Sequence, residues 1–459
     1  MRLSRTELQG RVNGDLQLRF AASGLTSYAG LELVRQYFSR FELSERIRRH
    51  LGRWAPRTDY GVVPMLLLVL MLIISGGRRV RHVRYLEGDP VVLRGCGLAR
   101  LPTARTVGRW LAQFDGVGEL KLRALNEEIV AAAIQASGLR RLTLDVDGSV
   151  VCTGLQVEGA RRGYNPHHRK VPSYYPITAY EAQSGQLVRV ENRAGNVHDG
   201  KASLAFLRRL FGQLQGTLGT DYVLEFRMDG AFFREDVLDL LEVQRAEYAI
   251  RVPFYQWLGL TERIRQRRRW RRVDAMVSCF EERLEIKPWQ RRLRVVVYRK
   301  RVYHQTHKNF QLDLFDPADG YYEYSAIVTN KSLKGTALWQ FMCGRGVHEK
   351  VYGELKNGFA FDCVPSQRYA ANSAWQLISV LAFNLMRGFQ VASGAQRRTG
   401  DRKRRARYRF QAIHTLRYQC LHRAGLIVRP GGRSTLDVGI ASGVKRRFSQ
   451  MLHSLRKAA

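Results

Sequence analysis

The chain has 459 residues, which excludes a single small binding module and predicts two to four domains. Hydrophobic residues make up 45% and aromatic residues 10% of the sequence, so extensive disorder is excluded although 25% of the residues are charged. The 76 Lys and Arg residues outnumber the 40 Asp and Glu residues, and the net charge of +36 predicts a polyanionic partner, for which nucleic acid is the obvious candidate.

The cysteines and the most apolar segment indicate the cellular compartment of the protein. Six cysteines are scattered singly without a CxxC pair, which excludes a zinc ribbon and a disulfide framework and predicts a reducing, cytoplasmic environment. The N-terminus lacks a secretory signal pattern. Residues 62–75 form an apolar run that contains Pro64 and is shorter than the ~20 residues of a spanning helix. We therefore predict a buried helix there and no membrane partner.

Residues 1–135 show the apolar spacing of helices, which predicts an all-α N-terminal region. Its function would be binding of a DNA end, with residues 106–114 as a candidate for docking in a groove. No spacing specifies a helix-turn-helix motif. A helical bundle that only packs against the core is therefore an open alternative.

From residue 140 the hydrophobic period changes to that of strands. Leu142, Leu144 and Val146 alternate with polar residues, and Ser184-Gly185 predicts a tight turn between two further strands. Over residues 140–253 the pattern predicts the order β-β-β-α-β-α-β, which is the first part of an α/β core.

Residues 254–323 interrupt this order. Between residues 263 and 301 there are 15 Lys or Arg residues against four Asp or Glu residues, which predicts a basic insertion rich in strands. The core resumes over residues 324–390 with a strand, one helix from about Lys334 to Lys356, and an apolar helix. Residues 391–459 form a basic C-terminal region that contains a highly charged segment. This segment, residues 396–409, has eight basic residues and one acid and predicts a solvated arm.

Three carboxylates occupy positions that this pattern singles out. Asp147 ends the first strand, Asp229 ends the strand after the first helix, and Glu349 lies in the late helix. Because the carboxyl ends of parallel strands meet at one rim of a sheet, we expect the three side chains to converge there. Their mutual repulsion requires raised pKa values or bound cations. Two Mg²⁺ ions would satisfy oxygen ligands of this kind and catalyse phosphodiester displacement.

The residues around Glu349 strengthen this hypothesis. Arg345 precedes it by four residues and Lys356 follows it by seven, so all three share one face of a helix. The same spacing also occurs in exposed helices that are merely ion-paired.

The sequence resembles the DDE transposases of bacterial insertion sequences, in the branch that carries the Y-R-E-K signature. Arg345, Glu349 and Lys356 match its last three residues, whereas Met342 stands at the Tyr position. The first and second acid blocks of the family resemble the segments LDVDGS and RMDGAFF. The family's sequence between these blocks resembles the segments GYNPHHRK and RAGNVHDG. The resemblance covers roughly residues 140–390 and implies an RNase H-like core whose third acid follows an insertion.

On this resemblance, Asp147, Asp229 and Glu349 would be the catalytic, metal-binding triad, with two Mg²⁺ ions for which Mn²⁺ can substitute. The phosphates near the transposon end would be contacted by Arg345 and Lys356. Further DNA contacts are expected from the residues Arg227, His167, His168, Arg169, Lys170, Trp270 and Trp289. For the two tryptophans the alternatives are core filling and stacking on an unpaired base.

Two other acidic motifs have competing interpretations. Asp145 and Asp147 form a DxD pair, which also occurs in nucleotide-sugar transferases, but such enzymes do not need a charge of +36. His198 and Asp199 form an HD dipeptide of the type that binds metal in phosphohydrolases. Because no second His and Asp pair accompanies it, we interpret this dipeptide as part of a polar loop.

The predicted fold class is α/β: an RNase H-like mixed sheet flanked by helices and interrupted by a β-rich insertion, with an all-α N-terminal region. The predicted function is that of a DNA transposase that binds the inverted-repeat ends of its element and catalyses metal-dependent strand cleavage and strand transfer. It would act on double-stranded DNA, at transposon ends and target, as a homodimer or higher assembly associated with the nucleoid. The alternatives are a structure-selective nuclease of the same fold and a non-catalytic DNA-binding derivative.

Overall fold

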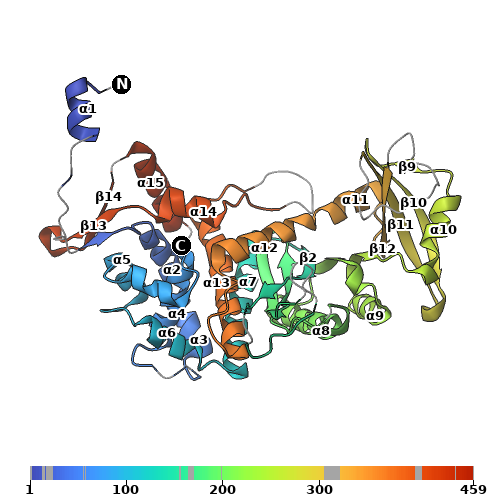
Figure 1. Cartoon of the computed structure of the whole chain (residues 1–459), viewed down its shortest axis with the longest axis horizontal. Coiled ribbons are helices and arrows are strands. Elements are labelled where there is room, and N and C mark those ends of the chain that lie inside the picture. The colour runs from blue at the N-terminus through green and yellow to red at the C-terminus, as the bar shows by residue number, and fades with distance from the viewer. Residues whose placement is uncertain are drawn as a thin grey trace.

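The computed structural model describes residues 3–12, 16, 24–54, 56, 58–154, 157–163, 170–197, 199–303, 321–397, 406–439 and 441–457. The molecule is elongated, with the N-terminal helices at one end, a mixed sheet in the middle and a group of long strands at the other end (Figure 1). All six cysteines are free, as their spacing predicts.

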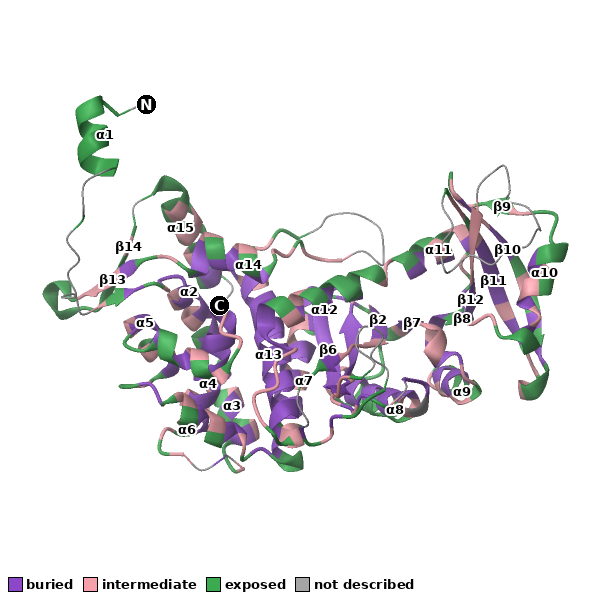
Figure 2. Cartoon of the chain, viewed as in Figure 1, coloured by how far each residue is buried: buried purple, intermediate pink, exposed green. Residues whose placement is uncertain are grey.

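The described part of the N-terminal third is helical apart from the two-residue strand β1 (Leu25–Thr26), which agrees with the predicted all-α region. Its α-helices are α1 (Arg5–Val12), α2 (Leu31–Arg40), α3 (Leu43–Leu51), α4 (Val62–Ile74), α5 (Pro90–Cys96), α6 (Ala104–Leu111) and α7 (Gly116–Ser137). Helix α1 stands apart from the body and none of its residues is buried (Figure 2).

Helix α4 is the apolar run identified in the sequence. Eleven of its 13 residues are buried, so it is surrounded by protein on all sides, which confirms the buried-helix prediction. Its side chains belong to one large core that also contains α2, α3 and α13 (Tyr369–Ala392). In the described part of the chain, no helix is both long and apolar enough to cross a membrane.

A nine-stranded sheet forms the centre of the molecule. Its strands lie in the order β6-β5-β2-β7-β8-β12-β11-β10-β9, with β2, β7 and β8 parallel and the other pairs antiparallel. The strands are β2 (Arg141–Gly148), β5 (Ile177–Glu181), β6 (Gln186–Glu191), β7 (Val223–Met228), β8 (Glu247–Val252), β9 (Arg271–Arg272), β10 (Val277–Ile286), β11 (Arg291–Val302) and β12 (Tyr321–Thr329). A separate pair is made by β3 (Val151–Cys152) and β4 (Ser173–Tyr174). The strands β2, β5, β6, β7 and β8 follow one another along the chain in the predicted order and lie side by side in this sheet.

The two faces of this sheet differ in character. Leu142, Leu144 and Val146 of β2 pack in a core with α7, α8 (Asp199–Leu218) and α9 (Glu235–Val243). The residues between them on β2 belong to the opposite face, where Asp145 binds a buried arginine and the Asp147 carboxylate contacts the segment between α11 (Gly335–Cys343) and α12 (Gly346–Phe359). The apolar face therefore anchors the sheet, and the polar face carries the acids toward those helices.

The predicted insertion is rich in strands, as expected, but it does not form a sheet of its own. Strand β12 pairs with β8, so β11, β10 and β9 extend the core sheet outward. Helix α10 (Leu260–Gln266) packs its buried Leu260 and Ile264 against the same core as α8 and α9. The insertion thus lengthens one edge of the core sheet.

The single helix expected from about Lys334 to Lys356 is in fact two, α11 and α12. The break falls at Gly344, where a Cβ atom would lie 2.0 Å from a guanidinium nitrogen of Arg227. Glycine is required there because any side chain would displace that guanidinium. Gly344 and Arg345 both keep right-handed helical backbone angles, and Arg345 is the N-cap residue that directly precedes α12.

The C-terminal region folds back on the N-terminal helices. It contains α14 (Ile413–Leu416), β13 (Gly425–Val428), β14 (Thr435–Val438) and α15 (Ser442–Lys457). Strand β13 pairs with β1 and β14, so the C-terminal region and the start of the N-terminal helical region share one small sheet. Of the predicted arm, residues 398–405 lie outside the described residues.

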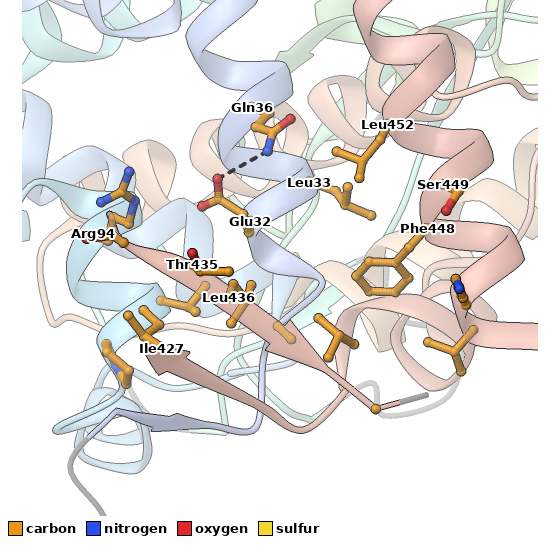
Figure 3. A pocket seen from close by; sticks show the side chains of 18 of the residues that line it. Glu32, Leu33, Gln36, Arg94, Ile427, Thr435, Leu436, Phe448, Ser449 and Leu452 are labelled. Atoms are coloured by element: carbon orange, nitrogen blue, oxygen red, sulfur yellow. Dashed lines mark hydrogen bonds between the residues drawn. The ribbon is translucent and has the colours of Figure 1, made fainter. Parts of the chain in front are cut away.

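This small sheet, together with α2, α5 and α15, encloses a cavity of 740 Å³ (Figure 3). Its lining is mixed: Leu33, Leu436 and Phe448 lie beside Glu32, which accepts a hydrogen bond of 3.2 Å from the Gln36 amide. The cavity is remote in the fold from the sheet that carries the predicted catalytic acids.

One buried ion pair ties the sheet to α11. Asp145 and Arg227 are partners across the parallel β2–β7 pair, and the guanidinium donates to both carboxylate oxygens at 2.6 and 2.7 Å. The third guanidinium contact is to the carbonyl oxygen of Phe341, at 2.9 Å. Burial raises the pKa of Asp145 and the charge of Arg227 opposes this rise. Both charges are therefore tolerated in the interior only as a pair.

We predict that Asp145→Asn lowers the free energy of unfolding by about 3–5 kcal/mol, because it leaves the Arg227 charge buried without its counter-ion. The double variant Asp145→Leu/Arg227→Met should be more stable than this single variant. Denaturant titration followed by tryptophan fluorescence measures both. Arg234→Met breaks a half-exposed pair with Asp236 and serves as the control, with an expected loss below about 1 kcal/mol. A double variant less stable than Asp145→Asn would contradict this account.

Candidate active site

Asp147 and Asp229 lie at the same rim of the sheet. Asp147 is the last residue but one of β2, and Asp229 directly follows β7, the parallel neighbour of β2. The Asp229 side chain accepts a hydrogen bond of 3.0 Å from the backbone N–H of Ala231 and so begins a short 3₁₀ turn. Strand order thus brings together two acids that are 82 residues apart in the sequence, as the alternating pattern of the two strands predicts.

The guanidinium of Arg345 bridges the two carboxylates. One of its terminal nitrogens lies 2.7 Å from Oδ2 of Asp147 and 3.8 Å from Oδ2 of Asp229. The Arg345 side chain is only 11% exposed, and its Nε has no hydrogen-bond partner among the described residues. A single cationic group therefore reaches both acids at once.

The electrostatics of the pair follow from this arrangement. Burial raises the pKa of Asp147 to about 7, with a further rise from the nearby Asp229 and Asp199 charges and an opposing effect of Arg345. The pKa of Asp229 is raised for the same principal reason, its burial, and is again opposed by Arg345. Both carboxylates are consequently poised to lose a proton when positive charge approaches.

Glu349 lies on the same helix but is not part of this cluster. It is an exposed residue in the first turn of α12, four residues after Arg345, a spacing that places the two Cβ atoms about 6 Å apart on one helix face. Among the residues that the structure describes, no three His, Cys, Asp or Glu side chains lie close enough to hold a metal ion together. The expected convergence is therefore seen for Asp147 and Asp229. Glu349 lies outside this pair, on the helix face that also carries Arg345.

Helix α12 is fixed to the sheet by a chain of buried hydrogen bonds. Tyr352 donates its hydroxyl to the backbone oxygen of Asp147 at 2.8 Å, and it lies 2.6 Å from the hydroxyl of Thr178. Thr178 is in turn 2.9 Å from Nε2 of His348. Since each hydroxyl has one proton, the consistent assignment runs from a His348 Nε2–H donor through Thr178 and Tyr352 to Asp147. This chain holds the helix that carries Arg345 and Glu349.

Asp199 is a neighbour of the site that the sequence did not identify as such. It is 4% exposed, it forms an ion pair with Arg193, and it accepts a hydrogen bond of 3.0 Å from the hydroxyl of Tyr175. A Cβ atom on Gly148, next to Asp147, would lie 2.9 Å from its Oδ1 and 2.6 Å from the Tyr175 ring. The HD dipeptide was the available signal, but the proximity to Asp147 depends on tertiary structure; His198 itself is outside the described residues.

The other predicted DNA contacts have varied placements. The Lys356 ammonium donates to the backbone oxygen of Val150 at 2.7 Å and is half-buried, and burial lowers the pKa of Lys356. Lys170 is exposed, whereas His167, His168 and Arg169 lie outside the described residues.

Arg227 does not fit the predicted role. It is 5% exposed, and its guanidinium is fully engaged by Asp145 and Phe341, so it is not available to a DNA phosphate in this structure. The error has a physical reason, because the register of β7 with β2 places Arg227 beside Asp145 on the sheet face that α11 covers.

The two tryptophans pack in the insertion. Trp270 lies edge-on to Phe280 with ring centroids 4.9 Å apart and is covered on one face by Arg299. Trp289 packs against Phe233, also at 4.9 Å, and against the half-exposed Trp257 at 6.0 Å. Both rings are partly buried, which favours core filling over stacking on a base in this conformation.

The family follows from the sequence match. Residues 9–459 match the model of the transposase DDE domain group 1. The chain belongs to the DDE transposases. It is accordingly an enzyme of DNA transposition that cuts and joins DNA strands. No curated protein sequence matches it.

Among solved structures, the piggyBac transposase synaptic complex with hairpin DNA resembles this transposase with a TM-score of 0.43 at 9% identity, over 95% of this chain and 88% of that one. The Mos1 transposase paired-end complex with the left transposon end gives a TM-score of 0.19 at 12% identity, over 53% and 64% of the two chains. The family assignment rests on the sequence match.

The buried histidine next to Glu349 generates a prediction for stability. Burial lowers the pKa of His348 to about 3, whereas an unfolded chain has a histidine pKa near 6.5. As the pH falls through this interval, the unfolded chain takes up a proton that the folded chain does not, so folding is progressively weakened. The difference is worth about 4–5 kcal/mol at pH 3.

We therefore expect the free energy of unfolding to fall less steeply from pH 6.5 to pH 4 in His348→Gln than in the wild type. Denaturant titrations at a series of pH values measure the slope. The exposed His453→Gln is the matched control and should keep the wild-type slope. Identical slopes for His348→Gln and the wild type would show that His348 is not held neutral.

Proposed function

We propose that the transposase binds the inverted-repeat ends of its element, hydrolyses a phosphodiester bond to release a 3′-hydroxyl, and directs this hydroxyl at target DNA. Asp147, Asp229 and Glu349 are the proposed metal ligands. The observation that carries the proposal is the pair of carboxylates from adjacent parallel strands, both reached by one guanidinium. Two acids that can share one cationic group can also share a metal ion.

The residues present fit divalent magnesium. The donors are carboxylate oxygens, which Mg²⁺ prefers, and burial, which raises the pKa values of Asp147 and Asp229, makes their charged forms costly unless a cation lies beside them. Glu349 supplies a further carboxylate from the first turn of α12. When bound, two such ions activate the attacking oxygen and stabilise the leaving one. Mn²⁺ has the same ligand preference and is the proposed substitute.

The remaining side chains position the DNA. Arg345 offers planar, bidentate donors to a phosphate, and Lys356 offers a point charge about three turns later along the same helix. The hydrogen-bond chain from His348 to the backbone of Asp147 fixes that helix relative to the acids. The net charge of +36 attracts DNA from a distance, and its spread over the chain suits a homodimer or higher assembly that holds two ends.

The finer assignment is to the Y-R-E-K branch of bacterial insertion sequences. Arg345, Glu349 and Lys356 lie in the order and spacing of the signature, at the start and along one face of α12. The position of the tyrosine is taken by Met342, which is buried on α11. We further propose that the protein acts at the nucleoid, where its substrate lies.

We expect Asp147→Asn, Asp229→Asn and Glu349→Gln each to reduce Mg²⁺-dependent cleavage and strand transfer by more than about 100-fold, because each removes a metal ligand. In the absence of divalent metal, binding to the ends should be retained, since the basic surface remains. Gel-based cleavage, a strand-transfer assay with pre-cut ends, and a binding titration provide the three measurements.

Asp221→Asn removes an exposed acid just before β7 and is the matched control. A site variant that cuts at the wild-type rate would remove that residue from the catalytic set. Cleavage without strand transfer in the wild type would instead indicate a nuclease. The affinity for DNA should fall with salt, with a log–log slope of about −0.9 per phosphate contact.

A further inference from the structure

Arg345 occupies the position that a catalytic cation would need. Its guanidinium contacts Oδ2 of Asp147 and Oδ2 of Asp229, which are oxygens that a metal ion shared by these acids would use. A guanidinium does not lose its proton in proteins, so this positive charge cannot be discharged. A divalent ion that approaches the two acids must either displace Arg345 or accept a second cation beside it.

The surroundings of Arg345 allow it to leave. Its Nε has no partner, and the only described ion pairs of the side chain are those with Asp147 and Asp229. The residues that follow it on α12, Gly346 and Val347, are exposed, so solvent lies next to the bridge. By contrast, the Arg227 guanidinium is fixed by three contacts in the interior. Arg345 is thus held less firmly than Arg227 and can exchange partners.

A DNA phosphate is the anion that would attract it. Phosphate oxygens accept the same planar pair of N–H groups as a carboxylate does, and the resulting contact is charge-assisted. The start of α12, where Arg345 lies, also has the positive end of a 14-residue helix dipole. A phosphate that binds there withdraws the guanidinium from the acids and leaves them with uncompensated negative charge.

We infer that Arg345 is an internal counter-ion that keeps the metal site closed until DNA binds. The inference rests on the proposed function and adds its regulation: the DNA phosphate takes Arg345, and the released carboxylates take the metal. Because linkage is reciprocal, DNA tightens the binding of metal and metal tightens the binding of DNA by the same factor. The transposase without DNA then carries little bound metal, which limits cutting away from the transposon end.

The test is Mn²⁺ binding to the full chain, measured by calorimetry or by the loss of the free-ion electron paramagnetic resonance signal. In the absence of DNA, Arg345→Gln should bind Mn²⁺ at least about tenfold more tightly than the wild type. Arg251→Gln is the matched control: Arg251 is exposed and acts on Asp229 only through its field, so its loss should change the affinity by less than about threefold.

A pre-cut duplex of the terminal repeat, read from the DNA that flanks the coding region, provides the second arm. It should tighten Mn²⁺ binding by the wild type at least about tenfold and leave Arg345→Gln nearly unchanged. If Arg345→Gln does not fold, Arg345→Lys replaces it, because a lysine keeps the charge without the planar fork; its Mn²⁺ affinity should lie between those of the wild type and the duplex-bound wild type.

Two outcomes overturn the inference: Mn²⁺ affinity without DNA that is the same in the arginine variant and the wild type, or equal tightening by the duplex in both. The double variant Asp147→Asn/Asp229→Asn separates this failure from that of the proposed function. If the double variant still binds Mn²⁺ like the wild type, the ion lies elsewhere and the proposed metal site itself fails. If binding is lost in the double variant but unaffected by Arg345, only the counter-ion role is wrong.

Discussion

The burial of two neighbouring carboxylates is the constraint on which the active site of this transposase depends. The parallel pairing of β2 and β7 fixes Asp147 and Asp229 at one rim, and their burial makes the two negative charges costly. In the structure a guanidinium balances them. In catalysis, metal ions would neutralise the two carboxylates in place of the guanidinium. The arrangement that is unfavourable without a cation is therefore the one that can bind a catalytic cation.

Much of the surrounding fold serves to hold this arrangement. The ion pair between Asp145 and Arg227 joins β2, β7 and the end of α11, and Gly344 leaves the space that this guanidinium needs. On α12, Tyr352 bonds the backbone of Asp147 on β2, and His348 bonds the hydroxyl of Thr178 on β5. The apolar side of the sheet, packed on α7, α8 and α9, gives these polar contacts a rigid base. Strands therefore position Asp147 and Asp229, and α12, which is fixed to the sheet, positions the Arg345 side chain that contacts them.

This core could be predicted from the sequence because the patterns that specify it, strand alternation and helical spacing, are local. Alternation in β2 and β7 placed Asp147 and Asp229 at strand ends, and helical spacing placed Arg345, Glu349 and Lys356 on one face. The features that could not be predicted from the sequence depend on strand register and on tertiary contacts. Arg227 turns inward because it lies across from Asp145, and Asp199 reaches the site through Tyr175 and Gly148. Strand propensity in the insertion likewise gave no information about the edge at which β12 would join.

The most direct test of the account is a crystal structure of the transposase with its cleaved DNA end and Mn²⁺, in which anomalous scattering locates the metal. The account predicts a peak about 2.0–2.2 Å from carboxylate oxygens of both Asp147 and Asp229, with the Arg345 guanidinium on a phosphate. A fully occupied ion that touches neither acid, or one that binds while Arg345 still bridges them, would contradict it.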